Sequence, residues 1–579
     1  MLRLIFTVVL SLLIISCSEK NMNADLILIN GNIYTVDESN PTAEAIAIKG
    51  DSILYVGTND GASQLSDDST KVIDLKGKFV MPGFIESHAH FLGIGQSKIN
   101  IDLSEAKNWS EIIYLVSSAA ENARPGEWII GRGWHQEKWD PKPLENVNGY
   151  PFHNELSRAT PRNPVFLKHA SGHAMFANQL AMELSGITDS TDNPNGGVIV
   201  RDSLGKAIGV FEEEAELLIQ KSLDNYLSKR TEKEVQDDLI KEIDKATEEC
   251  IKYGITSFHD AGSTFDEIDL YKKLADDNYF KVRLYLMLGE SNEMLNKKMS
   301  DYRMIGYGNN FLTVRAIKKY SDGALGSRGA WLLEPYDDLK YKIVDDDTSE
   351  YVGQSVTPLS ELEETANLAV KNGFQLCTHA IGDKANREVL NLYEKFISQN
   401  QSNELRWRIE HAQHLNEKDI PRFGRLGVIA AMQPVHCTSD AVFVPKRLGN
   451  QRAEEGAYVW RNLLDANAVI CSGTDAPVEK VNPFENIYSA VTRKSKDGTV
   501  FYLEQRMTRE EALKSYTLNG AYAAFEEKIK GSITKGKLAD IVVLSNDLMN
   551  CSEDEILSTE VLYTVVGGKI VYQKPESEE

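Results

Sequence analysis

The sequence has few cysteines and no long run of lysine and arginine. Its 579 residues include 6 cysteines, and without Cys17 an odd number remains, scattered through mostly apolar contexts. This pattern excludes a disulfide framework, so we expect buried free thiols. The formal net charge of −23 argues against a nucleic-acid partner or an anionic-membrane surface, since both would require clustered positive charge.

The chain also lacks an apolar run of the length that a transmembrane helix needs. The run near its start extends only from Leu4 to Ile15, with Arg3 before it and Cys17 shortly after it. This order predicts an export signal over residues 1–16. The ending "IISC" resembles a bacterial lipobox, which implies cleavage before Cys17 and lipid on that cysteine. An uncleaved anchor is the alternative, and either interpretation places the protein in the cell envelope, tethered to a membrane and facing the periplasm or the exterior.

Short strands are predicted at both ends of the chain. The segments "ADLILINGNIYTVDES" and "AEAIAIKGDSILYVG" alternate apolar and polar residues around Asn-Gly and Lys-Gly turns, as antiparallel strands do. The segment "GSITKGKLADIVVLSND" repeats this pattern near the other end. We therefore expect a small β-domain formed by residues 17–80 and 530–575, which would bracket a main domain of residues 81–529.

Compact apolar runs recur between helix-like segments in the middle of the chain. Amphipathic stretches such as "SELEETANLAVKN" lie between several of these runs and suit crossover helices. Eight strands alternating with helices predict an α/β fold, the (β/α)8 TIM barrel, whose functional groups lie at the C-terminal strand ends. The stretch of about residues 101–248 is too long for one βα unit, so we expect an insertion after the first strand. The eight runs are "GFIESHAHF", "GITSFHDAG", "KVRLYLML", "LTVRAIKKYSDG", "GFQLCTHAIGD", "RWRIEHAQHL", "GVIAAMQPVH" and "AVICSGTDAPV".

Side chains that can bind metal lie at the ends of five of these runs. Histidines one residue apart on a strand point to the same side, at a spacing that can chelate one ion. Several histidines with a carboxylate and an open position for water indicate a hydrolytic site, because a divalent ion such as Zn²⁺ lowers the pKa of water to about 7. The carboxylate could accept the proton of that water. The residues are His88, His90, Lys318, His379, His411 and Asp475.

Lys318 does not fit such a site as an ammonium group. A cation beside a metal ion is unfavourable, so this side chain must be neutral, distant or chemically altered. Lys319 directly follows it and is the alternative for the same role.

Seven segments together resemble the amidohydrolase superfamily, and within it amidohydrolase family 3, which includes N-substituted formamide deformylases. The resemblance covers nearly the whole mature chain. Glu86 departs from it, because many relatives have Asp at this position, and that change affects the support of the first two histidines. The segments are "PGFIESHAH", "IKKYSDGALGSRGA", "CTHAIGDKA", "RIEHAQ", "MQPVH", "SGTDAPVEKVNPF" and "GSITKGKLADIVVL".

The resemblance implies a barrel flanked by a β-sandwich and a site for one or two divalent ions. His88 and His90 would bind the more buried ion, and His379 and His411 would bind a second one. Lys318 would be carboxylated by CO₂ to a carbamate that bridges the ions. Asp475 would be both ligand and general base.

Four further residues are candidates for substrate binding. Trp134 and His173 lie in the insertion, where they would shape a pocket wall; the alternative is a surface aromatic without function for Trp134 and a structural role for His173. His259 ends the second strand, where it could bind substrate or support the metal ligands. Arg328 follows the fourth strand and could bind a substrate carboxylate with its two-pronged guanidinium group, or remain an ordinary surface arginine.

These observations predict a metal-dependent hydrolase that cleaves a C–N bond, most simply an amide, of a small molecule. A deaminase, or a hydrolase of a cyclic amide or ester, could use the same residues. A non-catalytic binding lipoprotein is the alternative from another class, because a fold does not determine a function. The complete ligand set with its proton shuttle favours the enzyme.

Overall fold

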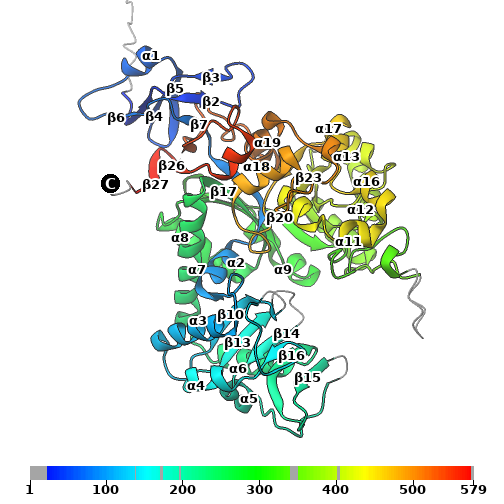
Figure 1. Ribbon diagram of the computed structural model, residues 1–579. Coiled ribbons are helices and arrows are strands. Elements are labelled where there is room, and N and C mark those ends of the chain that lie inside the picture. The colour runs from blue at the N-terminus through cyan, green and yellow to red at the C-terminus, as the bar shows by residue number, and fades with distance from the viewer. Residues whose placement is uncertain are drawn as a thin grey trace, which may run out of the picture.

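An eight-stranded parallel sheet forms the centre of the computed structural model (Figure 1). The structure describes residues 23–136, 139–169, 174–194, 197–339, 350–400 and 404–575. Each of the eight predicted runs contains one strand of this sheet, which confirms the expected barrel. In hydrogen-bonded order the strands are β8 (Phe84–Ala89), β17 (Ile255–Ser263), β18 (Arg283–Leu288), β20 (Leu312–Tyr320), β21 (Gln375–Ala380), β22 (Arg408–His411), β23 (Ile429–Met432) and β24 (Ile470–Ser472), with β19 (Met304–Gly306) added antiparallel to β20.

The barrel closes where the segment after β24 meets β8. The amide of Asp475 donates to the carbonyl of His88 at 2.8 Å. The amide of Thr474 donates to the Glu86 carboxylate at 2.7 Å, so a side chain replaces a strand carbonyl at this seam. Gly473 is required here, because a Cβ atom would clash with the Glu86 carboxylate and the backbone of His88.

Amphipathic helices cover the barrel, and one hydrophobic core fills the space between strands and helices. α8 begins with a capping box in which Thr264 and Glu267 satisfy each other's backbone amides. α11 ends at Gly373, whose φ of 69° suits a left-handed helix cap. The covering helices include α8 (Phe265–Asp276), α9 (Asn292–Tyr302), α11 (Leu359–Asn372), α12 (Asp383–Gln399), α13 (Ile420–Leu426), α17 (Trp460–Asp465) and α18 (Pro483–Thr492).

Two sheets formed by both chain ends pack at the N-terminal side of the barrel, where blue and red segments lie side by side in Figure 1. Their facing apolar residues share one core. The prediction that these strands pair in antiparallel fashion is only partly correct. β1 pairs with β6 in parallel, and β2 pairs with β7 in parallel, because the chain passes from one sheet to the other. The sheets are β5 (Ser52–Gly57), β4 (Ala45–Lys49), β1 (Leu26–Ile29), β6 (Lys71–Asp74), and β27 (Lys569–Gln573), β26 (Val561–Val566), β25 (Ile541–Leu544), β7 (Phe79–Pro82), β2 (Asn32–Tyr34), β3 (Thr42–Ala43).

A separate layer of sheet and helices interrupts the barrel after β8, below the barrel in Figure 1. α2 (Phe91–Ile99) leads toward it, and α7 (Glu232–Lys252) returns to β17. The two helices cross so closely that a Cβ atom at Gly95 would clash with the carbonyl of Glu242. The sheet has apolar clusters of its own on both faces. Its order is β15 (Gly197–Arg201), β16 (Ala207–Glu213), β14 (Ala174–Ala177), β13 (Val165–His169), β10 (Ile129–Trp134), β9 (Ile101–Asp102), and its helices include α3 (Trp109–Asn122), α4 (Asn154–Ala159), α5 (Gln179–Leu184) and α6 (Glu216–Leu227).

Cys17, the expected signal peptide of residues 1–16 and His173 lie outside the described residues. The cysteines of the described chain are free, as expected, and four of the five are buried. Among the helices of these residues, none has both the length and the apolar character that crossing a membrane requires.

Candidate metal centre

The predicted ligands come together at the C-terminal end of the barrel. Asp475 Oδ1 lies 3.3 Å from Nε2 of His90 and 3.7 Å from Nε2 of His88. The His411 ring lies between two others, with its centroid 4.7 Å from that of His88 and 4.5 Å from that of His379. Four imidazoles and one carboxylate, contributed by four different strand ends, therefore surround one small volume.

Local backbone geometry helps to aim two of these side chains. His411 has a φ of 75° and Asp475 a φ of 57°, a left-handed conformation that is uncommon for residues other than glycine. Such positions persist where the surroundings hold them, and they concentrate at functional sites. For Asp475, the hydrogen bond from its amide to His88 supplies part of that hold.

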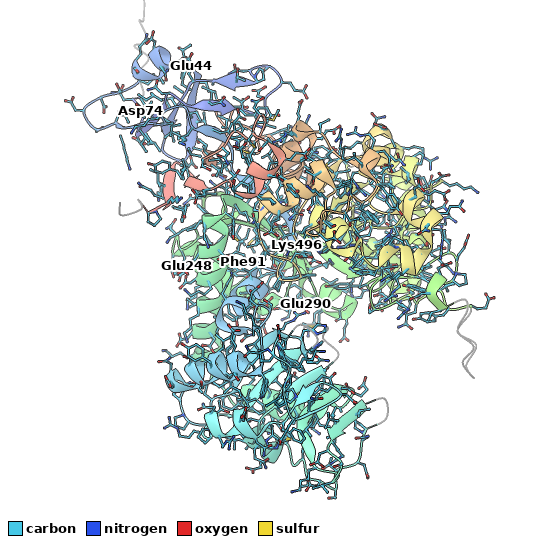
Figure 2. All side chains as sticks on the ribbon, in the orientation of Figure 1. Glu44, Asp74, Phe91, Glu248, Glu290 and Lys496 are labelled. Atoms are coloured by element: carbon cyan, nitrogen blue, oxygen red, sulfur yellow. The ribbon has the colours of Figure 1, made fainter. Side chains whose placement is uncertain are left out.

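The structure separates the two adjacent lysines. Lys318 is buried, and its Nζ lies 3.3 Å from Nε2 of His88 and 5.0 Å from the centre of the Tyr320 ring. Lys319 points away from the ligands, because its Nζ donates to the carbonyl of Glu290 at 3.1 Å (Glu290 is labelled in Figure 2). Strand alternation thus places Lys318 among the ligands and Lys319 on the outer side of β20.

A buried ion pair orients His88. Nδ1 of His88 is hydrogen-bonded to the Glu410 carboxylate, which leaves Nε2 facing Asp475 and Lys318. Arg408 binds the same carboxylate with two donors, at 2.8 Å and 2.9 Å, and donates to the Ser87 carbonyl at 2.6 Å. Carboxylates bound to the second nitrogen of a histidine fix its tautomer and raise its strength as a ligand. Glu410 was not assigned a role from the sequence, although it stands in the quoted "RIEH" segment.

His411 is oriented in the same way by an amide. Its Nδ1 lies 2.8 Å from Oε1 of Gln433, and Nε2 of Gln433 donates to the Ala431 carbonyl at 3.2 Å. Because that second bond assigns the amide nitrogen, the oxygen faces His411 and accepts its Nδ1 proton. The lone pair of Nε2 is then available to a metal ion.

Burial keeps His88 and His379 neutral, and their neighbour Asp475 stays ionised. Burial, with Lys318 nearby, lowers the pKa of His88 to about 4 and that of His379 to about 3. Burial would raise the pKa of Asp475, but the hydrogen bond with His90 and the neighbouring His411 outweigh it and hold that pKa well below its ordinary value. At neutral pH the site therefore offers neutral nitrogens and a carboxylate, the forms that bind metal.

An orphaned nitrogen supports the same conclusion. Nε2 of His379 is buried and has no hydrogen-bond partner in the described part of the chain. Such atoms are costly unless something binds them. Nitrogen and carboxylate donors around an open volume fit a divalent ion, and His88, His90 and Asp475 form one candidate group whose ligand atoms lie within 4.8 Å of one another.

His436 is a residue of this site that the sequence analysis missed. It lies in the first turn of α14 (Pro434–Asp440), four residues after the end of β23, and it is the last residue of the predicted run "GVIAAMQPVH". Its ring nitrogen, with those of His411 and Asp475 Oδ, forms a second group of donors within 4.8 Å of one another. The quoted segment "MQPVH" contains it and was the available signal.

The proposed substrate residues have other partners. Trp134 has no exposed surface and donates to the Leu167 carbonyl at 2.8 Å, so it is a core residue of the inserted layer and we leave it out of the substrate site. His259 lies beneath the ligands, with Nδ1 3.2 Å from Arg408, and supports that arginine. Arg328 binds Asp338 with two donors, at 2.6 Å and 3.3 Å, so an internal carboxylate occupies the group predicted to bind substrate.

Apolar side chains stand near the open side of the ligands. The Tyr320 ring is 42% exposed, and its centre lies 5.4 Å from that of His379. Val356, whose amide donates to the Ser321 carbonyl at 2.8 Å, and Val478, three residues after Asp475, are 57% and 64% exposed. These exposed apolar residues are therefore neighbours of the site.

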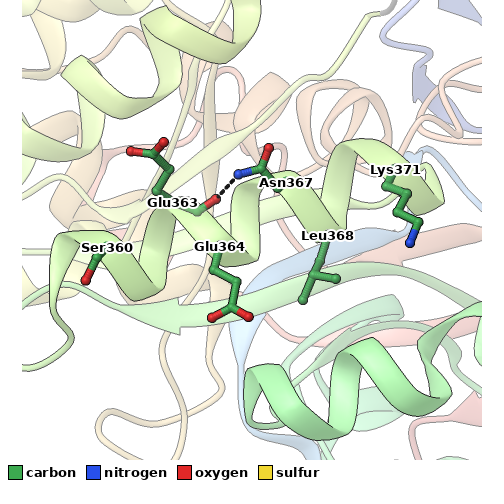
Figure 3. Close-up of a pocket in the computed structure, with 6 residues that line it drawn as sticks. All are labelled: Ser360, Glu363, Glu364, Asn367, Leu368 and Lys371. Atoms are coloured by element: carbon green, nitrogen blue, oxygen red, sulfur yellow. Dashed lines mark hydrogen bonds between the residues drawn. The ribbon is translucent and has the colours of Figure 1, made fainter.

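A surface pocket on α11 is separate from these ligands (Figure 3). It follows one face of the helix, where the side-chain amide of Asn367 donates to the carbonyl of Glu363 at 2.9 Å. None of the candidate ligands lines it, so this pocket is not the metal centre. Its lining residues are Ser360, Glu363, Glu364, Asn367, Leu368 and Lys371.

Comparison with known proteins agrees with this geometry. A family model described as "Amidohydrolase family" matches residues 71–572. The chain is 33% identical over 564 residues to Protein LONG AFTER FAR-RED 3 of Arabidopsis thaliana, covering 95% of this chain and 92% of that protein. It is 28% identical over 560 residues to N-substituted formamide deformylase of Arthrobacter pascens, covering 96% and 99%.

Solved structures give the same result. The crystal structure of an uncharacterized metal-dependent hydrolase from Pyrococcus horikoshii superposes with a TM-score of 0.73 at 26% identity. The match covers 91% of this chain and 99% of that one, so it includes the inserted layer and the terminal sheets as well as the barrel.

Proposed function

The chain belongs to the amidohydrolase family and is a metal-dependent hydrolase, and from this premise we propose that it cleaves a C–N bond, an amide, of a small molecule. One observation carries the proposal: the Asp475 carboxylate lies 3.3 Å from Nε2 of His90 and 3.7 Å from Nε2 of His88, among the candidate metal ligands. Hydrolysis requires a base that accepts the proton of the attacking water, in addition to the residues that hold the metal.

The residues divide the chemistry among themselves. His88, His90, His379, His411 and Asp475 would hold the metal. When bound, a divalent ion supplies a Lewis acid that makes water acidic near neutral pH. The free oxygen of Asp475 would take the proton of the attacking water and pass it to the nitrogen of the departing amine. The amine then leaves as a neutral molecule, which lowers the barrier to breaking the C–N bond.

Lys318 is proposed to carry a carbamate. Burial lowers the pKa of this amine, although Glu410 and Asp475 oppose the shift, and a neutral amine is the form that reacts with CO₂. The neutral amine nitrogen bonds to the carbon of CO₂ and releases one proton, which leaves an anionic carbamate. Counted from the ammonium form, two protons are released and a cation becomes an anion. The product would suit a position 3.3 Å from His88 Nε2, where an ammonium is unfavourable.

The exposed apolar neighbours of the site support a substrate class. Tyr320, Val356 and Val478 would face the part of the molecule that does not react. Arthrobacter pascens N-substituted formamide deformylase is a relative whose name specifies formamides with a substituent on nitrogen. We therefore propose small amides with an apolar N-substituent.

The site of action is proposed from the first residues. We propose that cleavage before Cys17 leaves a lipid-modified protein in the cell envelope. Mass measurement of the protein from its own membrane fraction tests this: a mature chain that begins at Cys17 and carries extra lipid mass supports it, and an unmodified start at Met1 contradicts it.

The first prediction tests the metal centre. Purified protein supplied with zinc and bicarbonate should hold about one or two equivalents of metal and hydrolyse members of a panel of N-alkyl and N-aryl formamides and acetamides. The double substitution His88→Ala and His90→Ala should lose the metal. Asp475→Asn should lower kcat by about 10³-fold, the contribution of a positioned general base.

Two outcomes would contradict the proposal. Protein that stays free of metal after this treatment would favour a binding lipoprotein. A metal-loaded protein that hydrolyses cyclic amides or esters and no N-substituted amide would contradict the proposed substrate class. Chelator treatment followed by zinc is the matched control, since activity should vanish and return.

A further inference from the structure

His436 combines burial with an unused nitrogen. The residue is 7% exposed, and its Nε2 has no hydrogen-bond partner within the ranges that the structure describes. Its ring lies nearly parallel to that of His411, at an interplanar angle of 14° and a centroid distance of 6.3 Å. Distance alone would make it a third metal ligand, because its nitrogen lies within 4.8 Å of the donors of His411 and Asp475.

The partner of the other ring nitrogen points to a different role. Nε2 of Gln413 lies 3.1 Å from Nδ1 of His436. With the Gln413 amide in this orientation its nitrogen donates, so Nδ1 accepts and carries no proton. In the neutral ring the proton is then on Nε2, and a protonated nitrogen has no lone pair for a metal ion. Gln433 does the opposite for His411, because it presents its oxygen to Nδ1.

We propose that His436 is a hydrogen-bond donor to the substrate, and that its Nε2–H binds the carbonyl oxygen as negative charge develops on it. This inference rests on the proposed amide hydrolysis and extends it to a residue outside the ligand set. A donor fixed in advance beside the reacting carbon stabilises charge that appears only in the transition state, and it requires no rearrangement when the reaction occurs.

Neighbouring groups leave this donor available. Asp440, on the same helix, accepts a hydrogen bond from the Tyr458 hydroxyl at 2.6 Å. Asp475 is bonded to His90 and is reserved for the metal and for the proton transfer. Gln413 holds the far side of the ring. Nε2 therefore has no hydrogen-bond partner among the described residues, in a ring that lies beside the candidate metal ligands.

The test uses His436→Ala and His436→Gln in the zinc-loaded full-length protein. Zinc content should stay at the wild-type value in both variants, because no ligand is lost. In His436→Ala, kcat should fall about 100-fold with a smaller change in KM, the usual effect of removing one such donor. Gln can present an N–H at a similar reach, so His436→Gln should recover part of the rate.

A second readout does not depend on turnover. Acetohydroxamic acid, a small carbonyl compound that binds zinc, can be titrated into the same proteins by calorimetry. The His436→Ala substitution should raise its Kd about tenfold, since one hydrogen bond to a charged oxygen is lost. A wild-type protein that binds this probe but hydrolyses no amide would contradict the proposed function and leave the inference on His436 measurable.

Matched glutamine variants separate the two tautomers. Gln413→Leu should lower kcat and keep zinc, whereas Gln433→Leu should weaken zinc binding about 10- to 100-fold, as loss of a group that orients a ligand does. His414→Ala controls for the loss of a buried imidazole, because that ring contacts Tyr458 and none of the ligands. The proposal is overturned if His436→Ala loses zinc, or if its kcat and probe affinity equal those of the His414→Ala control.

Discussion

Two buried ion pairs lie at opposite ends of the same barrel and have different roles. In the upper pair, beneath the metal ligands, Arg408 binds Glu410 at 2.8 Å and 2.9 Å, and neither side chain is exposed. In the lower pair, at the start of β18, Arg283 binds Asp540 at 2.7 Å and 3.0 Å, with side-chain exposures of 2% and 5%. Their chemistry and burial are almost the same.

Their remaining partners differ. Glu410 also binds His88, so the upper pair ends on a metal ligand. Asp540 also accepts from the Gly567 amide at 2.9 Å, and Arg283 donates to the carbonyl of Asn310 at 3.1 Å, so the lower pair joins the barrel to the terminal sheets. A buried ion pair is therefore no evidence for one kind of role, and its other contacts decide what it does.

The largest effect on stability is expected when the lower ion pair is broken. Asp540→Ala leaves the Arg283 charge buried without a partner and should lower the free energy of unfolding by about 3–5 kcal/mol. Metal content per folded molecule should not change, because none of the ligands contacts this pair. Urea unfolding and elemental analysis of the folded fraction measure both. A variant that is fully stable, or that loses metal while folded, would contradict the proposed division.

Breaking the upper pair should affect the metal. Glu410→Gln keeps the shape but removes the charge that orients Nδ1 of His88, so zinc affinity should fall about 10- to 100-fold. Competition with a chelator of known affinity measures this. Asp540→Ala is the matched variant. Equal zinc affinities in the two variants would contradict the proposal that only the upper pair supports metal binding.

The pH dependence of the upper pair is a smaller effect and is best measured in metal-free protein. Burial opposes ionisation of Glu410, but Arg408 and His88 outweigh it and hold the pKa of this carboxyl well below its ordinary 4.5. A depressed pKa contributes stability above the unfolded value, and this stability is lost as the pH falls through the folded value. Stability should therefore decrease below about pH 4.5, by up to about 1.4 kcal/mol per pH unit from this group.

Glu410→Gln provides the comparison for that experiment. The variant has no carboxyl to titrate at this position, so its unfolding free energy should change less steeply between pH 4.5 and pH 2. Equal slopes in both proteins would show that the pair does not titrate as proposed.

The smallest effect is expected when the arginine of the lower ion pair is replaced by lysine. Arg283→Lys keeps the charge but cannot bind Asp540 with two parallel donors or reach Asn310 at the same time, so stability should fall by about 1 kcal/mol. A loss as large as that of Asp540→Ala would mean that geometry, and not charge, dominates this contact. Both proteins can be compared by urea unfolding.

Sequence patterns predicted the frame of the site better than its surroundings. Each of the eight runs contains a barrel strand, because buried parallel strands are compact apolar segments with recognisable boundaries. Their common orientation then brings His88, His379 and His411 to one end. The resemblance to the amidohydrolase family is confirmed by the family match. The alternation of side chains along a strand could not show from the sequence which of Lys318 and Lys319 faces the ligands, since both lie in a mostly buried strand.

Residues outside the strand ends were harder to predict. His436 was not assigned although a predicted run ends on it, because the strand ends at Met432 and the direction of a side chain on the following helical turn cannot be taken from strand alternation. Trp134 was assigned to a pocket because no local pattern distinguishes a lining aromatic residue from one in the core of an insertion. The glutamines that set the tautomers of His411 and His436 could not be selected, because their roles depend on which amide atom faces the ring.

The seam of the barrel has a consequence for protein synthesis. The bond from Thr474 to Glu86 spans 388 residues, so its two halves leave the ribosome far apart in time. A nascent chain already contains His88 and His90 while Asp475 is still untranslated, and a chain that stops early lacks that ligand and base. Metal retention by this fold thus reports that translation has passed Asp475, and truncated products should be recognisable in a cell extract as the fraction that zinc does not protect from proteolysis.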